Sequence, residues 1–135
     1  MRLALPEGLA AQILAEARAA DPRECCGLIL GRRDGDGAIA AALQPARNVA
    51  ARDDRFEIAP EDHFTALRRA REQRQAVIGC YHSHPNGVAQ PSTHDVAGCG
   101  EDNFLWLIAT PDGALAAFVY FDGVMTGAVL VTSSS

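Results

Sequence analysis

Two histidines, a serine and an aspartate lie close together in this chain, at a spacing that suits metal-dependent hydrolysis. His82 and His84 follow an apolar run, 76–81, which predicts a buried strand that a proline then ends. Side chains at i and i+2 of a strand project from the same face, so both imidazoles can reach one point. The next loop leads to Ser92 and Asp95. Two neutral imidazoles and a carboxylate make three ligands with a fourth position open, which is the arrangement of catalytic zinc.

Each fragment also has an interpretation without chemistry. The histidines can be a solvated pair at the end of a strand. Ser92 and Asp95 fit a capping box, in which Ser92 is the N-cap of a helix and Asp95 its third residue. Capping does not explain the histidines, and the histidines do not need a capped helix at that distance. The combination therefore favours a functional site.

Glu24 is a candidate general base because it stands at the start of a second apolar run, 25–30. Charged residues are rarely buried without a partner. A carboxylate in this place is either a solvated strand end or a placed acid–base group, and its local context alone favours the solvated end.

The spacing of these residues resembles the signature of the JAMM (MPN+) metalloproteases. Glu24 is followed by His82-Ser83-His84-Pro85, six residues, and then Ser92 and Asp95 in a Ser-x-x-Asp motif. Asn48 and the stretch 55–60 resemble the family segment before its second helix. The resemblance covers roughly residues 1–130, so we expect a single JAMM domain over residues 1–135, and the sequence pattern predicts a frayed tail at 132–135. The resemblance also implies an α/β (α+β) fold, a curved and mainly antiparallel β-sheet flanked by helices.

The same resemblance implies a role for each residue of the motif. His82, His84 and Asp95 would bind Zn²⁺, Glu24 would transfer protons, and Ser92 would donate a hydrogen bond to the oxyanion. The protein would then be a zinc-dependent metallopeptidase, an enzyme without a covalent intermediate.

The implied substrate is an amide or isopeptide bond at the C-terminal tail of a ubiquitin-like protein. The chain lacks room for the insertions of eukaryotic members and resembles the stand-alone prokaryotic ones, which are associated with sulfur-carrier proteins. We expect an extended tail to join a sheet edge by strand addition. Two alternatives remain open: a peptidase of cell-wall or phage-tail peptides, and a non-catalytic MPN scaffold module.

Length, charge and composition limit the number of domains, the kinds of partner and the cellular compartment that we expect. The chain has 135 residues, enough for one domain with its own core. The net charge of −5 argues against a nucleic-acid surface. No run is long enough to span a membrane and the start does not read as a signal peptide, so we expect a cytoplasmic protein of undetermined oligomeric state. None of the four cysteines forms a Cys-x-x-Cys motif, although a labile Cys80–Cys99 bridge is conceivable.

Periodicity and turn residues predict the elements that carry the motif. The second predicted helix should direct Phe64, Leu67 and Ala70 inward and several arginines into solvent. The predicted helices are 6–20, 60–74 and 92–100, and the predicted strands are 25–32, 38–43, 55–58, 76–81, 104–109, 114–121 and 124–131.

Overall fold

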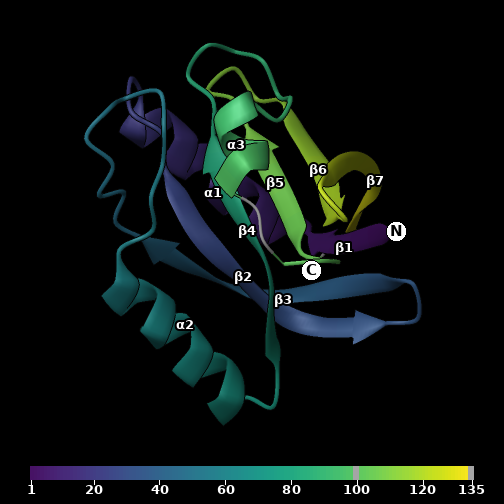
Figure 1. The fold of residues 1–135 in the computed structure, drawn as a ribbon. Helices are drawn as coiled ribbons and strands as arrows, with labels where there is room; N and C mark the ends of the chain where they lie inside the picture. The colour runs from purple at the N-terminus through teal and green to yellow at the C-terminus, as the bar shows by residue number, and fades with distance from the viewer. Residues whose placement is uncertain (99–100, 134–135) are drawn as a thin grey trace.

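Strands that close into a barrel form the framework of the protein, and helices pack against its surfaces (Figure 1). The computed structural model describes residues 1–98 and 101–133. The elements are β1 Arg2–Pro6, α1 Glu7–Ala20, β2 Cys26–Asp34, β3 Gly37–Ala46, α2 Pro60–Glu72, β4 Ala76–Ser83, α3 Thr93–Gly98, β5 Leu105–Ala109, β6 Leu115–Phe121 and β7 Val124–Ser133.

The strand order is β1-β3-β2-β4-β5-β6-β7, and β7 returns to β1. The β2–β3, β2–β4, β5–β6 and β6–β7 pairs are antiparallel. The β1–β3, β1–β7 and β4–β5 pairs are parallel. The mixed α/β fold predicted from the sequence is confirmed, and the curvature of the sheet is strong enough to bring its first and last strands together.

Helices α1 and α2 cover two separate hydrophobic cores. Helix α1 is amphipathic and buries Ile13 and Ala17 in a core with β1, β4, β5 and other strands. Helix α2 places Ala66 and Ala70 over Leu28 and Cys80 in the second core. The strands between the helices are therefore fixed on both faces, which makes them a rigid support for side chains at their ends.

A bulge in β4 decides which way the predicted metal ligands point. The β2–β4 register shifts between Ile29 and Leu30, and the extra residue on β4 is Ile78. Ile78 packs in the core of α1, whereas Cys80, two residues later, packs in the core of α2. An inserted residue resets the alternation of a strand, so Cys80 and then His82 lie on the side of α2.

Three predictions from the sequence need correction. Strand β1 was not foreseen, because it is short and its partners are distant in sequence. The strand predicted at 55–58 is wrong, since that segment makes only an isolated bridge between Asn48 and Ile58. The tail predicted at 132–135 is wrong for its first half, because Thr132 and Ser133 end β7 and pair with β1; the remaining two residues lie outside the described part.

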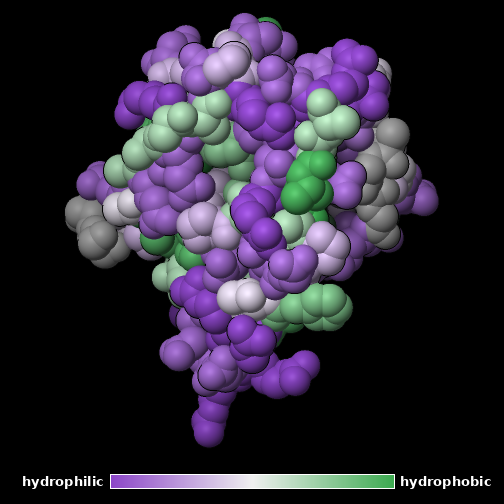
Figure 2. All heavy atoms as spheres, turned by 90° about the vertical axis from the view of Figure 1, so that its left-hand side faces the viewer, coloured by the Kyte–Doolittle hydropathy of each residue, from purple (hydrophilic) through white to green (hydrophobic). Residues whose placement is uncertain are grey.

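The predicted inward face of α2 is also wrong at two positions. Phe64 and Leu67 are 67% and 44% exposed, while Ala66 and Ala70 are buried. Small side chains let the helix approach the sheet closely, and the larger apolar residues remain outside. Figure 2 shows the left-hand face of Figure 1 as mainly hydrophilic, with apolar residues in separate patches. Within the described residues, no helix has the length and apolar character that crossing a membrane requires.

Candidate metal centre

Three ligand atoms form a small triangle at the end of β4. The Nε2 atoms of His82 and His84 lie 3.0 Å apart, and Asp95 Oδ2 lies 3.1 Å from each of them. All three side chains are buried, with exposures of 0%, 6% and 6%. A triangle with these edges leaves a point about 2 Å from every corner, the distance at which zinc binds imidazole and carboxylate ligands. The residues present thus fit a metal ion with an open fourth position.

The hydrogen bond at the far side of the His84 ring fixes its tautomer. His84 Nδ1 lies 2.8 Å from the carbonyl oxygen of Val88. A carbonyl only accepts hydrogen bonds, so Nδ1 carries the proton and Nε2 of the neutral ring presents a lone pair. Nε2 lies 3.1 Å from Asp95 Oδ2, an acceptor when the carboxylate is ionised, so either a proton or a metal cation must lie between the two groups.

The protonation states of the three side chains also favour a cation at the centre of the triangle. Burial lowers the pKa of His82, so its ring is neutral near pH 7. Burial opposes ionisation of Asp95, but hydrogen bonds with the two histidines outweigh it and lower the pKa of the carboxyl. For His84, burial is likewise outweighed by hydrogen bonds to Asp95 and the Val88 carbonyl, and its pKa is raised. The site therefore combines a neutral imidazole with a carboxylate that attracts positive charge.

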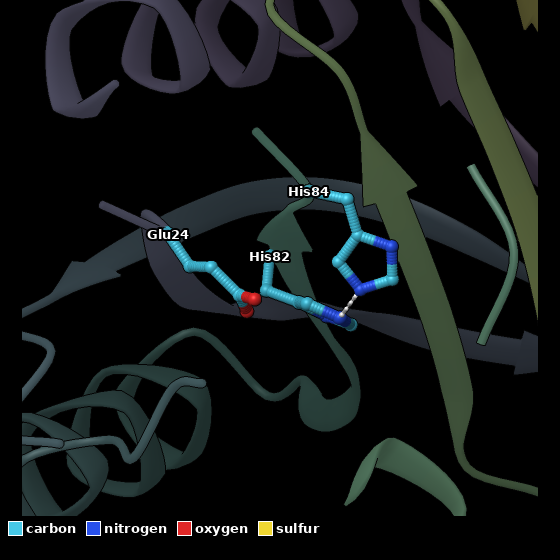
Figure 3. Close-up of side chains that lie close together, drawn as sticks. All are labelled: Glu24, His82 and His84. Atoms are coloured by element: carbon cyan, nitrogen blue, oxygen red, sulfur yellow. Dashed lines mark hydrogen bonds between the residues drawn. The ribbon is translucent and has the colours of Figure 1, made fainter. Parts of the chain in front are cut away.

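Glu24 lies beside the histidines, just before β2 (Figure 3). A carboxylate oxygen of Glu24 and a ring nitrogen of each histidine all lie within 4.8 Å of one another. Glu24 is only 5% exposed, and its Oε1 atom has no hydrogen-bond partner in the described part of the chain. Burial raises the pKa of Glu24 to about 7. The solvated strand end favoured by local sequence is wrong, and the carboxylate is in a position to exchange protons near neutral pH.

The main chain that follows the Glu24 side chain is tied to its surroundings. The neighbouring amide N–H of Cys25 donates to Ser83 Oγ at 2.8 Å, and the amide N–H of Ser83 donates to the Cys25 carbonyl at 3.1 Å. The carboxamide of Asn48 donates to the Glu24 carbonyl at 2.9 Å. Ser83, which separates the two histidines in sequence, thus holds the strand of the candidate base against the strand of the candidate ligands.

Ser92 forms the capping box predicted from the sequence and still remains available for chemistry. The amide N–H of Asp95 donates to Ser92 Oγ at 3.1 Å, and the amide N–H of Ser92 donates to Asp95 Oδ2 at 2.9 Å. The cap uses an acceptor site of the hydroxyl and leaves its O–H proton for another partner. The structural and the chemical interpretations of Ser92 are therefore compatible.

Two cavities adjoin the site. One of about 200 Å³ is lined by Glu24, His84 and Ser92 together with loop residues such as Asp54. The other, of about 490 Å³, is lined by Asp95 and by apolar residues of β2, β4 and β5 and of the loop before α2. Each cavity thus includes at least one of the candidate site residues in its wall.

Phe56 is the residue near the site that the sequence analysis missed. Its ring stacks on the His82 imidazole, with centroids 4.3 Å apart and an interplanar angle of 19°. The available signal was a single aromatic residue within a charged segment, 52–57. The possible Cys80–Cys99 bridge stays untested, because Cys99 lies outside the described residues.

Known proteins match this chain over most of its length. A family model for prokaryotic homologs of the JAB domain matches residues 6–120. The chain belongs to this family. The JAMM/MPN resemblance predicted from the sequence is thereby confirmed.

Individual relatives of this JAB-domain protein agree with the family assignment. A desampylase from Haloferax volcanii is 34% identical over 86% of each chain. The tail tip assembly protein K of Escherichia phage N15 is 33% identical over 76% of this chain, which spans only 39% of the phage protein. The solution structure of a protein from Desulfitobacterium hafniense has a TM-score of 0.89 at 26% identity, covering 100% of this chain and 94% of that one.

Proposed function

We propose that this JAB-domain protein is a zinc-dependent metallopeptidase acting on the C-terminal tail of a ubiquitin-like or sulfur-carrier protein. It would hydrolyse an amide or isopeptide bond there. The observation that carries the proposal is the buried triangle of His82, His84 and Asp95, with Glu24 beside it, whose Oε1 atom has no hydrogen-bond partner among the described residues. The similarity to a desampylase over 86% of both chains supports this class of substrate.

His82, His84 and Asp95 would hold the metal. Zinc in such a site supplies Lewis-acid polarisation of the scissile carbonyl and lowers the pKa of water. Asp95 contributes the negative charge of the ligand set, and its carboxylate is oriented by the Ser92 amide N–H. This main-chain bond does not depend on the side chain at position 92.

Glu24 would act as the general base and then as the general acid. With a pKa of about 7, its carboxylate accepts a proton from the attacking water and returns it to the leaving amine near neutral pH. The anchored peptide group between Glu24 and Cys25 keeps the carboxylate in place between these two transfers. Ser92 Oγ would donate its free O–H to the oxyanion of the tetrahedral intermediate.

The closed barrel leaves little open sheet edge for the tail of the substrate. Strand β1 pairs with β3 only at Ala38 and Ile39, so among the described strands the rest of β3, up to Ala46, has a neighbour only in β2. Addition of the tail to a sheet edge therefore stays a prediction. We infer that the tail lies in the two cavities beside the ligand triangle. The smaller cavity, which contains Glu24, would take the leaving amine, because that residue returns the proton.

A direct assay tests this function. The zinc-loaded protein should release a β-grasp sulfur carrier from a lysine isopeptide, and mass spectrometry should show an intact diglycine terminus on the product. Dialysis against a chelator should abolish release, and added Zn²⁺ should restore it. Failure to cleave any tail conjugate by a protein that retains zinc would contradict the proposed substrate class.

A phage-tail or cell-wall peptidase remains a second candidate, because the chain is similar to a tail tip assembly protein. Muropeptides incubated in parallel with the sulfur-carrier conjugate would separate the two substrates. The scaffold alternative predicts that neither substrate is cleaved and that the protein need not hold zinc.

A further inference from the structure

The two candidate histidine ligands are oriented in different ways. The ring of His84 is fixed by the hydrogen bond from Nδ1 to the Val88 carbonyl. His82 is completely buried, yet its Nδ1 atom has no hydrogen-bond partner in the described part of the chain. Metal-binding histidines almost always donate their second ring N–H to a protein group or water, which fixes the ring. Some other contact must orient His82.

Aromatic rings surround His82 instead. The Phe56 ring lies nearly parallel to the imidazole of His82, with ring centroids 4.3 Å apart. The Trp106 ring is nearly perpendicular to the same imidazole, with centroids 5.8 Å apart and an interplanar angle of 88°. Phe56 and Trp106 also contact each other edge to face at 5.9 Å. A ring held on its face and at its edge cannot rotate without displacing its neighbours. A metal-bound imidazole is also positively polarised, and the face of an aromatic ring attracts positive charge.

The segment that carries Phe56 is itself fixed. Asn48 donates to the carbonyl of Arg55 at 3.0 Å and accepts from the amide N–H of Glu57 at 3.0 Å, so it binds both sequence neighbours of Phe56. Its carboxamide also donates to the Glu24 carbonyl. A single polar side chain thus connects the loop of the stacked ring with the main chain of the candidate base.

We propose that Phe56 is the positioning residue for His82, and that its stacked ring replaces the hydrogen bond that usually orients a metal-binding histidine. This inference rests on the proposed function, in which His82 binds the metal. Phe56 then sets both the affinity for zinc and the geometry of the ligands, with Asn48 acting through the loop that holds it.

Zinc affinity and the visible spectrum of the Co²⁺-substituted protein test the proposal. Phe56→Leu keeps an apolar side chain but removes the flat ring, and should weaken Zn²⁺ binding about 10- to 100-fold, the range for losing an outer contact of a ligand. It should also shift the Co²⁺ absorption bands. Phe56→Tyr keeps the ring, and the cavity beside it has room for a hydroxyl, so affinity and spectrum should return towards wild type.

Phe104→Leu is the matched control, because Phe104 lines the same cavity and packs in the same core but makes no ring contact with His82 among the described residues. Its Zn²⁺ affinity should remain within about 3-fold of wild type, below the range for an outer contact of a ligand. Asn48→Asp serves as a second route if Phe56→Leu does not fold. It removes the donor to the carbonyls of Arg55 and Glu24 and keeps the acceptor for Glu57, and should weaken Zn²⁺ binding in the same direction.

Wild-type affinity and an unchanged Co²⁺ spectrum in Phe56→Leu would overturn the inference. Equal losses in Phe56→Leu and Phe104→Leu would overturn it as well, because the effect would then come from packing of the cavity. A wild-type protein that binds neither metal would overturn the proposed function itself, and the inference with it.

Discussion

Replacing Ser92 separates its capping role from its proposed role in the reaction. Ser92→Ala removes the acceptor of the Asp95 N–H and the O–H donor together. Loss of an N-cap costs about 1 kcal/mol of stability, which changes the folded fraction of a protein stable by several kcal/mol only slightly. Loss of one oxyanion donor lowers kcat about 10²- to 10³-fold. The cap therefore cannot account for the expected loss of activity.

Ser92→Asp makes the separation sharper. Aspartate is a good N-cap and should recover most of the stability lost in Ser92→Ala. It also places a negative charge beside the developing oxyanion, so kcat should fall below that of Ser92→Ala. Both variants keep the main-chain N–H that orients Asp95, and both should retain zinc.

Three measurements on the purified variants decide the matter: thermal unfolding, zinc content by elemental analysis, and kcat on a tail conjugate. We expect stability in the order wild type, Ser92→Asp, Ser92→Ala, and activity in the order wild type, Ser92→Ala, Ser92→Asp. Full activity in Ser92→Asp would refute the oxyanion role and leave Ser92 as a cap alone.

Further predictions concern the metal, the base and the half-buried thiol of Cys25. Alanine at His82, His84 or Asp95 should abolish stoichiometric zinc by elemental analysis, and metal retained after all three substitutions together would exclude this ligand set. Glu24→Gln should keep zinc but lose about 10²- to 10⁴-fold in turnover, and near-normal turnover would remove Glu24 from the mechanism. Burial raises the pKa of Cys25 to about 11. Iodoacetamide at pH 8 should therefore label this thiol about 100-fold more slowly in the folded than in the denatured protein, as peptide mass spectrometry can check; equal rates would contradict the raised pKa of Cys25.

The sequence predicted the ligand cluster because its geometry is local. The i, i+2 spacing of His82 and His84 on a strand and the capping box at Ser92 each follow from a few neighbouring residues, and the structure brings them together as expected. Phe56 could not be placed in the same way. Its position depends on hydrogen bonds between the loop, Asn48 and the main chain of Glu24, which are distant in sequence.

The errors in the predicted fold have the same origin. Hydrophobicity favoured Phe64 and Leu67 for the core of α2, but both are largely exposed, and Ala66 is buried there beside the correctly predicted Ala70. The residues of α2 that face the core cannot all be predicted without knowing the sheet on which the helix packs. Strand β1 pairs in parallel with β3 and β7, and such long-range partners leave no local pattern in a five-residue segment.

Closure of the barrel by its first and last strands has a consequence for folding in the cell. Leu3 pairs with Leu130, so the pairing that completes the barrel joins segments near opposite ends of the described chain. Contacts with so large a sequence separation form slowly, because the loop must close before they stabilise anything. During synthesis, β1 emerges before β7 and until then has only β3 beside it. The nascent chain therefore carries an open strand that invites pairing with other chains, and protection of β1 during translation should matter more for the yield of this protein than its final stability does.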